Sequence, residues 1–413
     1  MYKDELREDV ASSSHADRSH VDRSASDERK TANLAGADHG PALERQADGS
    51  VRICSFELAS QLLRSGCVRQ AGFNAELVAR LPQKNVSVLF KDGDEHRRQR
   101  SAVARFFAPA VVVERYRRVM TEMSVRLVDQ LRQRRRAALD DMSLDLSVAV
   151  AAEIVGLTDS LCAGLGKRLN RFFTMESPAK VGSFRGAAYV ARAQLHLLLV
   201  YLLDVRPAIR SRRRSRREDL ISHLIEQGWS NFDILTECVT YGTAGMSTTR
   251  EFIVIAAWHL LEREDLRRRF LSTDDQGRSD ILEEILRLEP AVGTLFRRTN
   301  VALTLNDRGR TEEIPSDTLV AIDVRGVNSD QTAAGACPHQ LDPDRRRRGP
   351  AAHMSFGDGP HRCPGASVAL QETSVFLDHL LRVPGIRLVC APEISWNGVT
   401  MGYVLRGAIL ALD

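Results

Sequence analysis

The sequence predicts a mainly α fold with a minor β component. Two observations lead to this prediction. Asn231 to Arg263 carries a very long helical pattern of apolar residues without a proline. From about residue 298 the sequence instead becomes strand-like and rich in turns. The composition, with 43% hydrophobic and 27% charged residues among 413, is typical of a globular protein and excludes collagen-like or wholly disordered chains.

The chain divides into a tail and one large domain. Residues 1–46 are rich in Ser, Asp, Arg, Ala and His, and Tyr2 is their only aromatic residue. Such a segment buries too little apolar surface to offset the entropy of ordering, so we expect a disordered N-terminal tail. Residues 47–413 have a core-forming composition and are assigned to a single domain, although this length also fits two or three.

Apolar periodicity and turn residues define the expected elements in chain order. Residues 66–90 carry no clean period and are expected to form a loop, and the arginine-rich run Ser211–Arg217 is expected to break the helical region as a solvated loop. Pro290 ends one helix, and Asn306–Gly309 is a turn signal. Helices are predicted over Phe56–Leu63, Asp94–Phe107, Val111–Arg132, Leu144–Ile154, within 160–204, over Asn231–Arg263, Ser279–Leu288 and Cys363–Leu381, and strands over Val51–Cys54, Val301–Leu305, Thr318–Ile322 and twice near the C-terminus.

Charge and cysteine usage narrow the partners and the compartment. The net charge is only +4, and the arginine runs 212–217 and 345–348 lack interleaved aromatic residues, so we expect no nucleic-acid partner. Seven dispersed cysteines without a CxxC pair indicate reduced thiols. Met1 is not followed by an apolar signal region, and Ala187–Leu203 is judged too short and too polar to span a bilayer. We therefore expect a cytoplasmic protein with no membrane partner.

The stretch Phe356–Gly365, FGDGPHRCPG, carries the strongest chemical signal. Its two closely spaced glycines make a loop that can lie flat against a large ligand. Pro364 suits the first position of a helix, where the dipole and free N–H groups stabilise a thiolate on the preceding Cys363. Because no further Cys or His ligands lie nearby, a zinc site is excluded. Haem, which supplies four nitrogens itself and needs one axial thiolate, fits this pattern.

This stretch resembles the haem-thiolate loop F-G-x-G-x-H/R-x-C-x-G of the cytochrome P450 family at every fixed position. The resemblance covers nearly the whole chain after the tail. It implies the family's triangular haem domain with a small strand-rich lobe, haem b as the cofactor, and Cys363 as the axial ligand of the iron. It also implies that Phe356, Gly357 and Gly365 pack against the haem.

Glu284 and Arg287 stand three residues apart on one predicted helix, about 80 residues before the cysteine, and can form a local ion pair. In this position they resemble the E-x-x-R pair of the family's helix K, a buried pair that locks the core behind the haem loop. The family adds a third partner, often an arginine or a histidine. Gln340 aligns with that partner, and Arg345 is the alternative.

The sequence Ala244-Gly-Met-Ser-Thr248 lies midway along the longest predicted helix. Gly245 lowers helix stability by about 1 kcal/mol and suggests a close backbone approach. Thr248 can bond back to the carbonyl of Ala244 and open the helix locally. The stretch resembles the oxygen-binding groove A/G-G-x-D/E-T of helix I, except that Ser247 replaces the acid. Serine can relay a proton but cannot supply one at neutral pH.

Four cations complete the resemblance. His96 and Arg100 share a helix face at spacing i, i+4, and both can donate to a carboxylate. They resemble the helix C residues that hold the haem propionates. Arg297, thirteen residues after Glu284, and His361, two before the cysteine, match the other propionate donors, with Arg298 as the alternative to Arg297.

The resemblance implies a monooxygenase that hydroxylates or epoxidises a mostly apolar small organic molecule, a specialised metabolite. Thr248, assisted by Ser247, is the expected oxygen-activating residue. Oxidative coupling or desaturation is the alternative within the enzyme class, and a non-enzymatic haem sensor is a more distant one. The expected pocket includes Phe172, Phe173, Leu295, Phe296 and Tyr403.

No reductase domain is visible, so a separate ferredoxin and ferredoxin reductase are the expected electron donors. An acidic ferredoxin is expected to dock on a basic surface around the haem loop. The arginines assigned to that surface are Arg345–Arg348, Arg362, and Arg97 or Arg98.

Overall fold

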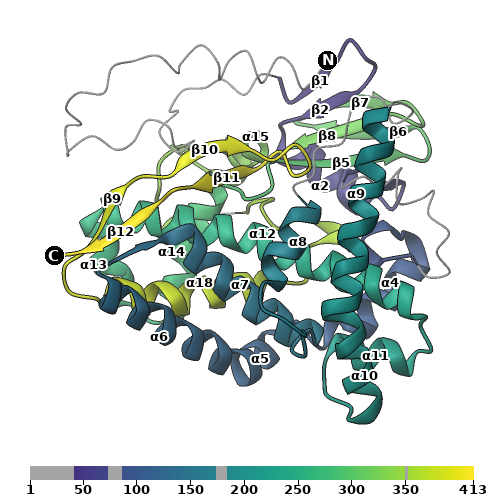
Figure 1. The fold of residues 1–413 in the computed structure, drawn as a ribbon. Coiled ribbons are helices and arrows are strands. Elements are labelled where there is room, and N and C mark those ends of the chain that lie inside the picture. Colours follow the sequence, from purple (N-terminus) through teal and green to yellow (C-terminus); the bar gives the residue numbers. More distant parts are fainter. Residues whose placement is uncertain (1–40, 73–85, 174–183, 349–351) are drawn as a thin grey trace.

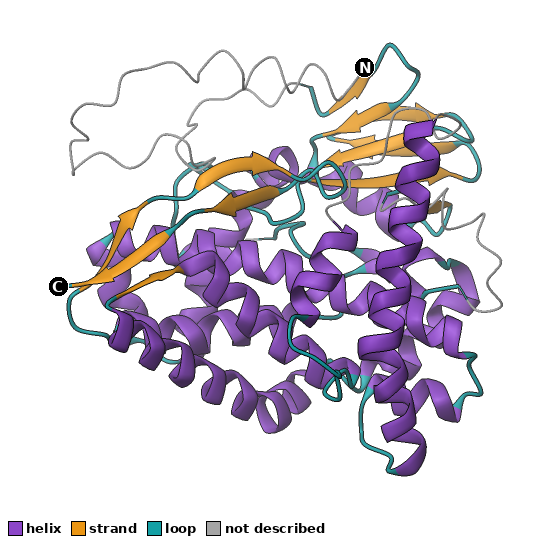
Figure 2. Ribbon diagram, viewed as in Figure 1, coloured by secondary structure: helices purple, strands orange, loops and turns teal. Residues whose placement is uncertain are grey.

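The computed structural model describes residues 41–72, 86–173, 184–348 and 352–413. The long helix α12 (Asn231–Glu262) runs through the middle of the molecule, and the other helices surround it (Figure 1). The strands gather along one edge, above the helical body in this view (Figure 2). This arrangement confirms the predicted class, mainly α with minor β.

Local sequence explains why α12 is so long. Ser230 caps its start by accepting a hydrogen bond from the N–H of Asp233, and no proline interrupts it. Residues 252–260 are buried without exception, so the C-terminal half packs on every side. Its main neighbours are α7 (Leu139–Val155) and α18 (Ala366–Leu381), which share the largest hydrophobic core with it.

The remaining helices are mostly short and amphipathic. Two π-helical turns, η3 (Val112–Tyr116) and η4 (Tyr201–Val205), join neighbouring helices into longer rods. The others are α2 (Phe56–Arg64), η2 (Val88–Phe90), α4 (Gly93–Ala104), α5 (Pro109–Val111), α6 (Arg117–Arg134), α8 (Leu165–Phe173), α9 (Phe184–Val200), α10 (Arg206–Arg214), α11 (Leu220–Glu226), α13 (Glu264–Ser272), α14 (Asp275–Leu288), α15 (Val324–Asn328), α16 (Gln331–Ala334), α17 (Arg345–Arg348) and η5 (Gly359–His361).

The strands form four small sheets. The largest has the order β1-β2-β8-β5-β3, in which β2 and β8 are parallel and the other pairs antiparallel. β6 pairs with β7, β10 with β11, and β12 lies between β4 and β9. Their bounds are β1 (Leu43–Arg45), β2 (Val51–Ile53), β3 (Val68–Gln70), β4 (Arg136–Ala138), β5 (Thr294–Thr299), β6 (Leu303–Asp307), β7 (Arg310–Ile314), β8 (Leu319–Asp323), β9 (Ile386–Cys390), β10 (Glu393–Trp396), β11 (Tyr403–Arg406) and β12 (Ile409–Leu412).

The structure departs from the sequence predictions at several boundaries. β1 lies inside the segment assigned to the tail, because it gains a partner in β2, while residues 1–40 lie outside the described residues. The expected loop 66–90 contains β3 and η2, and the C-terminus forms four strands rather than two. The helix expected to start at Cys363 starts at Ala366, with Gly365 as its N-cap.

The predicted basic break at Ser211–Arg217 is wrong in its first half. α10 continues to Arg214, and Arg212 is only 1% exposed. The Arg212 guanidinium binds the carboxylates of Asp159 and Asp219 and also donates to the carbonyl of Gly156. Arginine-rich segments are usually exposed to solvent. The prediction failed because the acids that pair with Arg212 are not its immediate neighbours in the sequence.

Among the described residues, one helix, Ala188–Arg214, is long and apolar enough to cross a membrane by length and composition alone, so the prediction that this stretch is too short and too polar is wrong on that criterion. The sequence had placed the end of this stretch at Leu203, because it did not predict that α9, η4 and α10 join. The rod is nevertheless part of the fold. Asp204 is fully buried within it and accepts hydrogen bonds from Arg168 at 2.8 and 2.6 Å, and Val205, Ala208 and Ile209 are buried in the core.

Candidate active site

The glycine loop before Cys363 folds back on itself. The N–H of Cys363 donates to the carbonyl of Phe356 at 2.8 Å. Gly357 and Gly359 both have positive φ, +68° and +64°, a region that side chains disfavour. A Cβ on Gly359 would also lie 2.2 Å from the carbonyl oxygen of Leu63. The two glycines are therefore required by the shape of the loop.

The Cys363 thiol sits among groups with opposing effects on its pKa. Burial raises the pKa, while the N–H of Gly365 and the guanidinium groups of Arg100 and Arg362 favour the thiolate. Although α18 starts three residues later than expected, the N–H of its N-cap residue Gly365 still favours the thiolate, and the two guanidinium groups add to this effect. Among the described residues, no cluster of three or more His, Cys, Asp or Glu side chains is arranged to hold a metal by itself.

The four predicted cations converge beside this loop. The rings of His96 and His361 stack with their centroids 4.1 Å apart. Burial, followed by the charges of His361 and Arg100, lowers the pKa of His96 to about 4, and Arg297 also acts on it. Burial likewise lowers the pKa of Arg297 to about 10. Asp92 accepts from His361 at 3.1 Å and is the acid that acts on this cluster.

The structure separates Arg297 from its alternative. Arg297 is 5% exposed and lies with the cluster, whereas Arg298, the next residue on β5, donates to the carbonyl of Asp317 at the surface. Arg297 is buried and Arg100 is half-buried, and both guanidinium groups stay charged, whereas Asp92 is exposed, so the site favours an anionic ligand. A flat dianionic group bound between the glycine loop and α12 satisfies both features. The residues present therefore fit haem b with its two propionates.

On α12 the predicted groove faces an open space. Ala244 is exposed midway along this otherwise largely buried helix. Thr248 donates to the carbonyl of Ala244 at 2.7 Å, and Ser247 donates to the carbonyl of Thr243 at 2.8 Å. A Cβ on Gly245 would lie 3.6 Å from the Cβ of Ala151 on α7, an ordinary contact, so the structure does not show the close backbone approach that this glycine suggested. Both hydroxyl groups donate their protons to backbone carbonyls of α12. Each hydroxyl oxygen can still accept a hydrogen bond.

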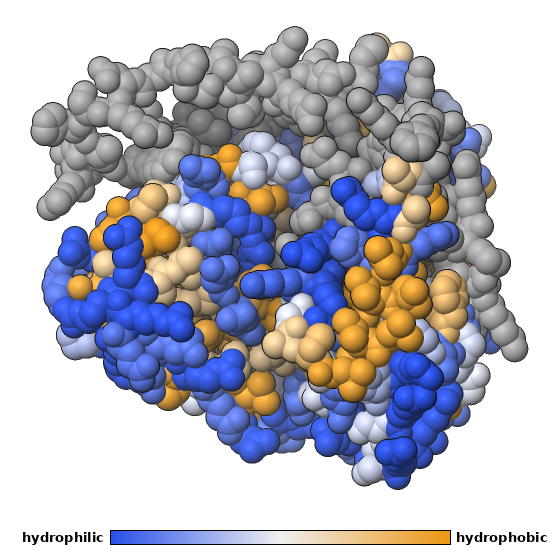
Figure 3. Space-filling model, viewed as in Figure 1, coloured by the Kyte–Doolittle hydropathy of each residue, from blue (hydrophilic) through white to orange (hydrophobic). Residues whose placement is uncertain are grey.

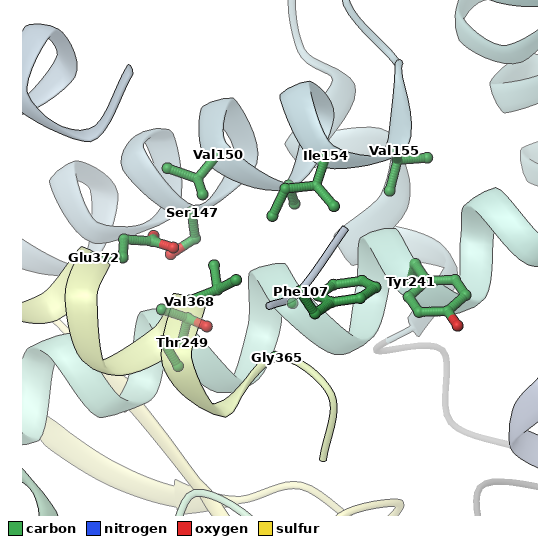
Figure 4. A pocket seen from close by; sticks show the side chains of 13 residues that line it. Phe107, Ser147, Val150, Ile154, Val155, Tyr241, Thr249, Gly365, Val368 and Glu372 are labelled. Atoms are coloured by element: carbon green, nitrogen blue, oxygen red, sulfur yellow. The ribbon is translucent and has the colours of Figure 1, made fainter. Parts of the chain in front are cut away.

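A small cavity of about 50 Å³, partly open to solvent, lies where α7, α12 and α18 meet (Figure 4). Gly245 and Gly365 both line it, so it adjoins the groove and the cysteine loop. Most of its lining is apolar, and Ser147, Thr249 and Glu372 make one end polar. Figure 4 shows the Glu372 carboxyl beside Ser147, with Thr249 on the facing helix.

Glu372 is the residue at this site that the sequence predictions missed. It is 2% exposed, Ser147 is its hydrogen-bonding partner, and its Oε1 atom has no partner. Burial raises the pKa of Glu372 to about 8. Ser147 already donates its own proton to the carbonyl of Ser143, which leaves its oxygen free to accept from a protonated Glu372. An acid at apolar spacing between Val368 and Phe376 was the sequence signal for this burial.

Glu284 and Arg287 form the predicted pair, with contacts of 2.8 and 2.9 Å. The third partner is Arg345, whose Nε donates to Glu284 at 3.1 Å. Gln340 contributes its backbone carbonyl to both arginines instead of its side chain. Arg345 is therefore buried, and its assignment to the exposed docking surface is wrong.

The five residues that the sequence assigned to the substrate pocket differ in their surroundings. Leu295 and Phe296 are half-buried on β5. Tyr403 is 3% exposed and donates to the buried Glu289 at 2.7 Å, so it belongs to the core rather than to a pocket lining. The side chains of Phe172 and Phe173 lie outside the described residues.

Known proteins resemble this chain in both sequence and fold. Residues 279–383 match the family described as Cytochrome P450. A mycinamicin IV hydroxylase/epoxidase from Micromonospora griseorubida is 30% identical over 333 residues, 78% of each chain. Cytochrome P450 107B1 from Saccharopolyspora erythraea is 27% identical over 349 residues, 82% of this chain and 78% of that protein.

Among solved structures, HmtN, a hydroxylase of himastatin biosynthesis, superposes with a TM-score of 0.72 at 21% identity, covering 93% of this chain and all of that one. A mutant of P450 EryK in complex with erythromycin B gives 0.73 at 20% identity, covering 93% and 97%. Fold, sequence and site chemistry agree, and the chain belongs to the cytochrome P450 family of haem-thiolate monooxygenases, with haem b as its cofactor.

Proposed function

We propose that this P450 oxidises a mostly apolar specialised metabolite and that Cys363 is its axial thiolate. The observation that carries the assignment is the glycine loop, which positions Cys363 beside Arg100 and the cation cluster. Relatives include a mycinamicin IV hydroxylase/epoxidase and a nocardicin C N-oxygenase, whose names support a substrate from specialised metabolism. Seven free cysteines support the cytoplasm as the compartment.

The cofactor-binding residues are assigned by chemistry. His96, Arg100, Arg297 and His361 neutralise the two propionates. Phe356, Gly357 and Gly365 would pack against the ring, and Ala244 and Gly245 would leave room for it beside α12. Bound haem supplies the oxidising chemistry, while the chain's own residues position the substrate, exclude water and hold protons.

Thr248 and Ser247 are proposed to handle protons at the groove. Both hydroxyls donate to helix carbonyls, so each oxygen can accept a proton or a hydrogen bond but neither residue is an acid. We assign the acid role to Glu372, which holds a proton at neutral pH and lines the cavity that Gly245 and Thr249 also line. A neutral carboxylic acid there compensates for serine at the position of the family's acid.

Electrons are proposed to come from a separate ferredoxin with its reductase. The basic docking surface is smaller than the sequence predicted, because Arg345 is buried and Arg346 binds Glu283. The side chains of Arg347 and Arg348 lie outside the described residues. The described candidates that remain exposed are Arg362 and Arg98, with Arg97 paired to Asp94 at 3.3 Å.

Absorption spectroscopy of the reduced, CO-bound protein tests the thiolate assignment. Wild type and Cys238→Ala are expected to show the red-shifted Soret band of the family, and Cys363→Ala is expected to lose it. Cys238 is a matched control because it is buried within α12 and away from the loop. An unchanged band in Cys363→Ala would refute the assignment.

The departure at Ser247 favours a second candidate reaction, in which the same oxidant couples or desaturates the substrate without inserting oxygen. Mass spectrometry of the product separates the two reactions. Oxygen insertion adds one oxygen atom, whereas desaturation or intramolecular coupling removes two hydrogen atoms.

A further inference from the structure

Large aliphatic side chains gather on the outer face of α9 and the η4 turn that continues it. Val190, Leu195, Leu198 and Leu202 are 39%, 54%, 50% and 37% exposed. Leucines 195, 198 and 202 are spaced three and four residues apart, so they form one row along the helix. Figure 3 shows this row as an apolar band over α9 that gives way to hydrophilic residues over α10.

Leu161 enlarges the apolar area. It is 70% exposed, and its N–H donates to the carbonyl of Leu203, next to the end of the row. These five residues are nearly half of the large hydrophobic side chains that are exposed in the described part of the chain. Such a concentration marks an interaction surface rather than scattered surface residues.

The same helix continues as a cationic face. Arg206, Arg210, Arg213 and Arg214 follow the leucine row and are all exposed. Asp204 is the one acid between Phe184 and Arg214, and it is buried against Arg168. Within the described residues, no acidic side chain pairs with Arg206, Arg210 or Arg214, and Arg213 donates to Asn231. The rod from Phe184 to Arg214 therefore offers leucines followed by positive charge and carries no exposed acid of its own.

This combination restricts what can cover the face. A stable interface between two copies needs about 800 Å² from each, more than a single row of leucines provides. Specific protein partners are usually gripped by buried aromatic anchors, and the exposed large apolar residues of this face are all aliphatic. An anionic lipid surface requires only shallow apolar insertion and cations near the headgroups.

We propose that the outer face of α9, η4 and α10 rests on an anionic lipid surface. Leu195, Leu198 and Leu202 enter the interface, and the exposed arginines 206, 210, 213 and 214 contact lipid phosphates. The contact is peripheral, because the inner side of the same rod is held in the protein by Asp204 and Arg212. It does not depend on the proposed substrate or on catalysis.

Co-sedimentation of the full-length haem-bound protein with vesicles tests the proposal. We expect binding to vesicles of equal parts phosphatidylglycerol and phosphatidylcholine, weak binding to phosphatidylcholine alone, and release as salt rises. Each arginine contributes about fivefold to the affinity. Arg206→Glu with Arg210→Glu should therefore weaken binding at least 20-fold, roughly the product of two such factors. Arg126→Glu with Arg134→Glu, two exposed arginines of α6, is the matched control.

The contribution of the leucine row is tested with a separate control. Leu198→Glu with Leu202→Glu should abolish binding, whereas Val113→Glu with Val301→Glu, at equally exposed sites on η3 and beside β6, should not. Both pairs lie at the surface, so near-ultraviolet circular dichroism should show intact folding. Failure of wild type to bind anionic vesicles at low salt, or equal binding by both glutamate pairs, would overturn the proposal. Sedimentation showing a dimer that Leu198→Glu dissolves would reassign the face to a second copy.

Discussion

Two buried glutamates near the cysteine loop differ in their surroundings, and the difference separates a structural role from a chemical one. Glu284 meets two arginines and the N–H of Asp342. Glu372 meets a serine and an apolar cavity. A carboxylate stays charged when cations surround it, whereas an acid buried without a cation keeps its proton. The first therefore acts as a clamp and the second as a proton store.

Replacing each acid by glutamine tests this contrast most strongly. Glu284→Gln leaves the buried charges of Arg287 and Arg345 without an anion, so we expect the free energy of unfolding to fall by about 3–5 kcal/mol. Urea unfolding measures the change. Glu264→Gln, which breaks an exposed pair with Arg268, serves as the control and should cost less than about 1 kcal/mol. Equal losses in the two variants would contradict the clamp.

Glu372→Gln should behave in the opposite way, because it never ionises. The carboxyl has its ordinary pKa of 4.5 in the unfolded chain and about 8 in the folded one. Stability from this group is therefore complete below about pH 4.5 and is lost as the pH rises through about 8. At pH 9 the variant should be more stable than wild type by roughly 3–5 kcal/mol, while the two should agree near pH 5.

The difference between the two unfolding curves isolates Glu372 from other buried acids. Glu251, whose pKa burial also raises to about 8, remains in both proteins and cancels. Infrared spectroscopy adds a direct measurement, since the difference spectrum between wild type and Glu372→Gln at pH 7 should show a protonated carboxyl band, while the bands of Glu251 and Glu237 cancel. A difference spectrum without that band would show that Glu372 is ionised.

The sequence predicted the ion pairs of Glu284 better than the protonated state of Glu372, and the reason is physical. Glu284 and Arg287 are neighbours on one helix, so their pairing is local. Arg345 joins them from 61 residues away, and sequence could name it only as an alternative to Gln340. The apolar spacing around Glu372 signals its burial, but its partner Ser147 lies on α7, and no local pattern predicts how α7 and α18 pack. The four cations were predicted because each belongs to a motif, and the fold was needed to choose Arg297 over Arg298.

The next largest expected effect concerns the supply of protons to the groove on α12. Thr248→Ala should raise peroxide release per electron pair several-fold, because the groove loses its alcohol. Glu372→Gln should raise it less, and Ser247→Asp should reverse the loss in the Glu372→Gln background by returning an acid to α12. Peroxide and product are measured together at pH 7. If Ser247→Asp helps wild type and Glu372→Gln equally, Glu372 is not the missing acid.

The smallest effect concerns electron delivery, and it extends the comparison to charges at the surface. Arg98 and Arg362 are exposed near the cysteine loop, whereas Arg346 is held by Glu283. A cation already bound to an acid contributes less to the field that attracts an acidic ferredoxin. Arg98→Glu with Arg362→Glu should therefore slow stopped-flow reduction by ferredoxin several-fold at low salt, and Arg346→Glu should slow it less. The gap should close above physiological ionic strength, where screening acts within about 8 Å. Equal rates in all variants at low salt would place the ferredoxin on another face.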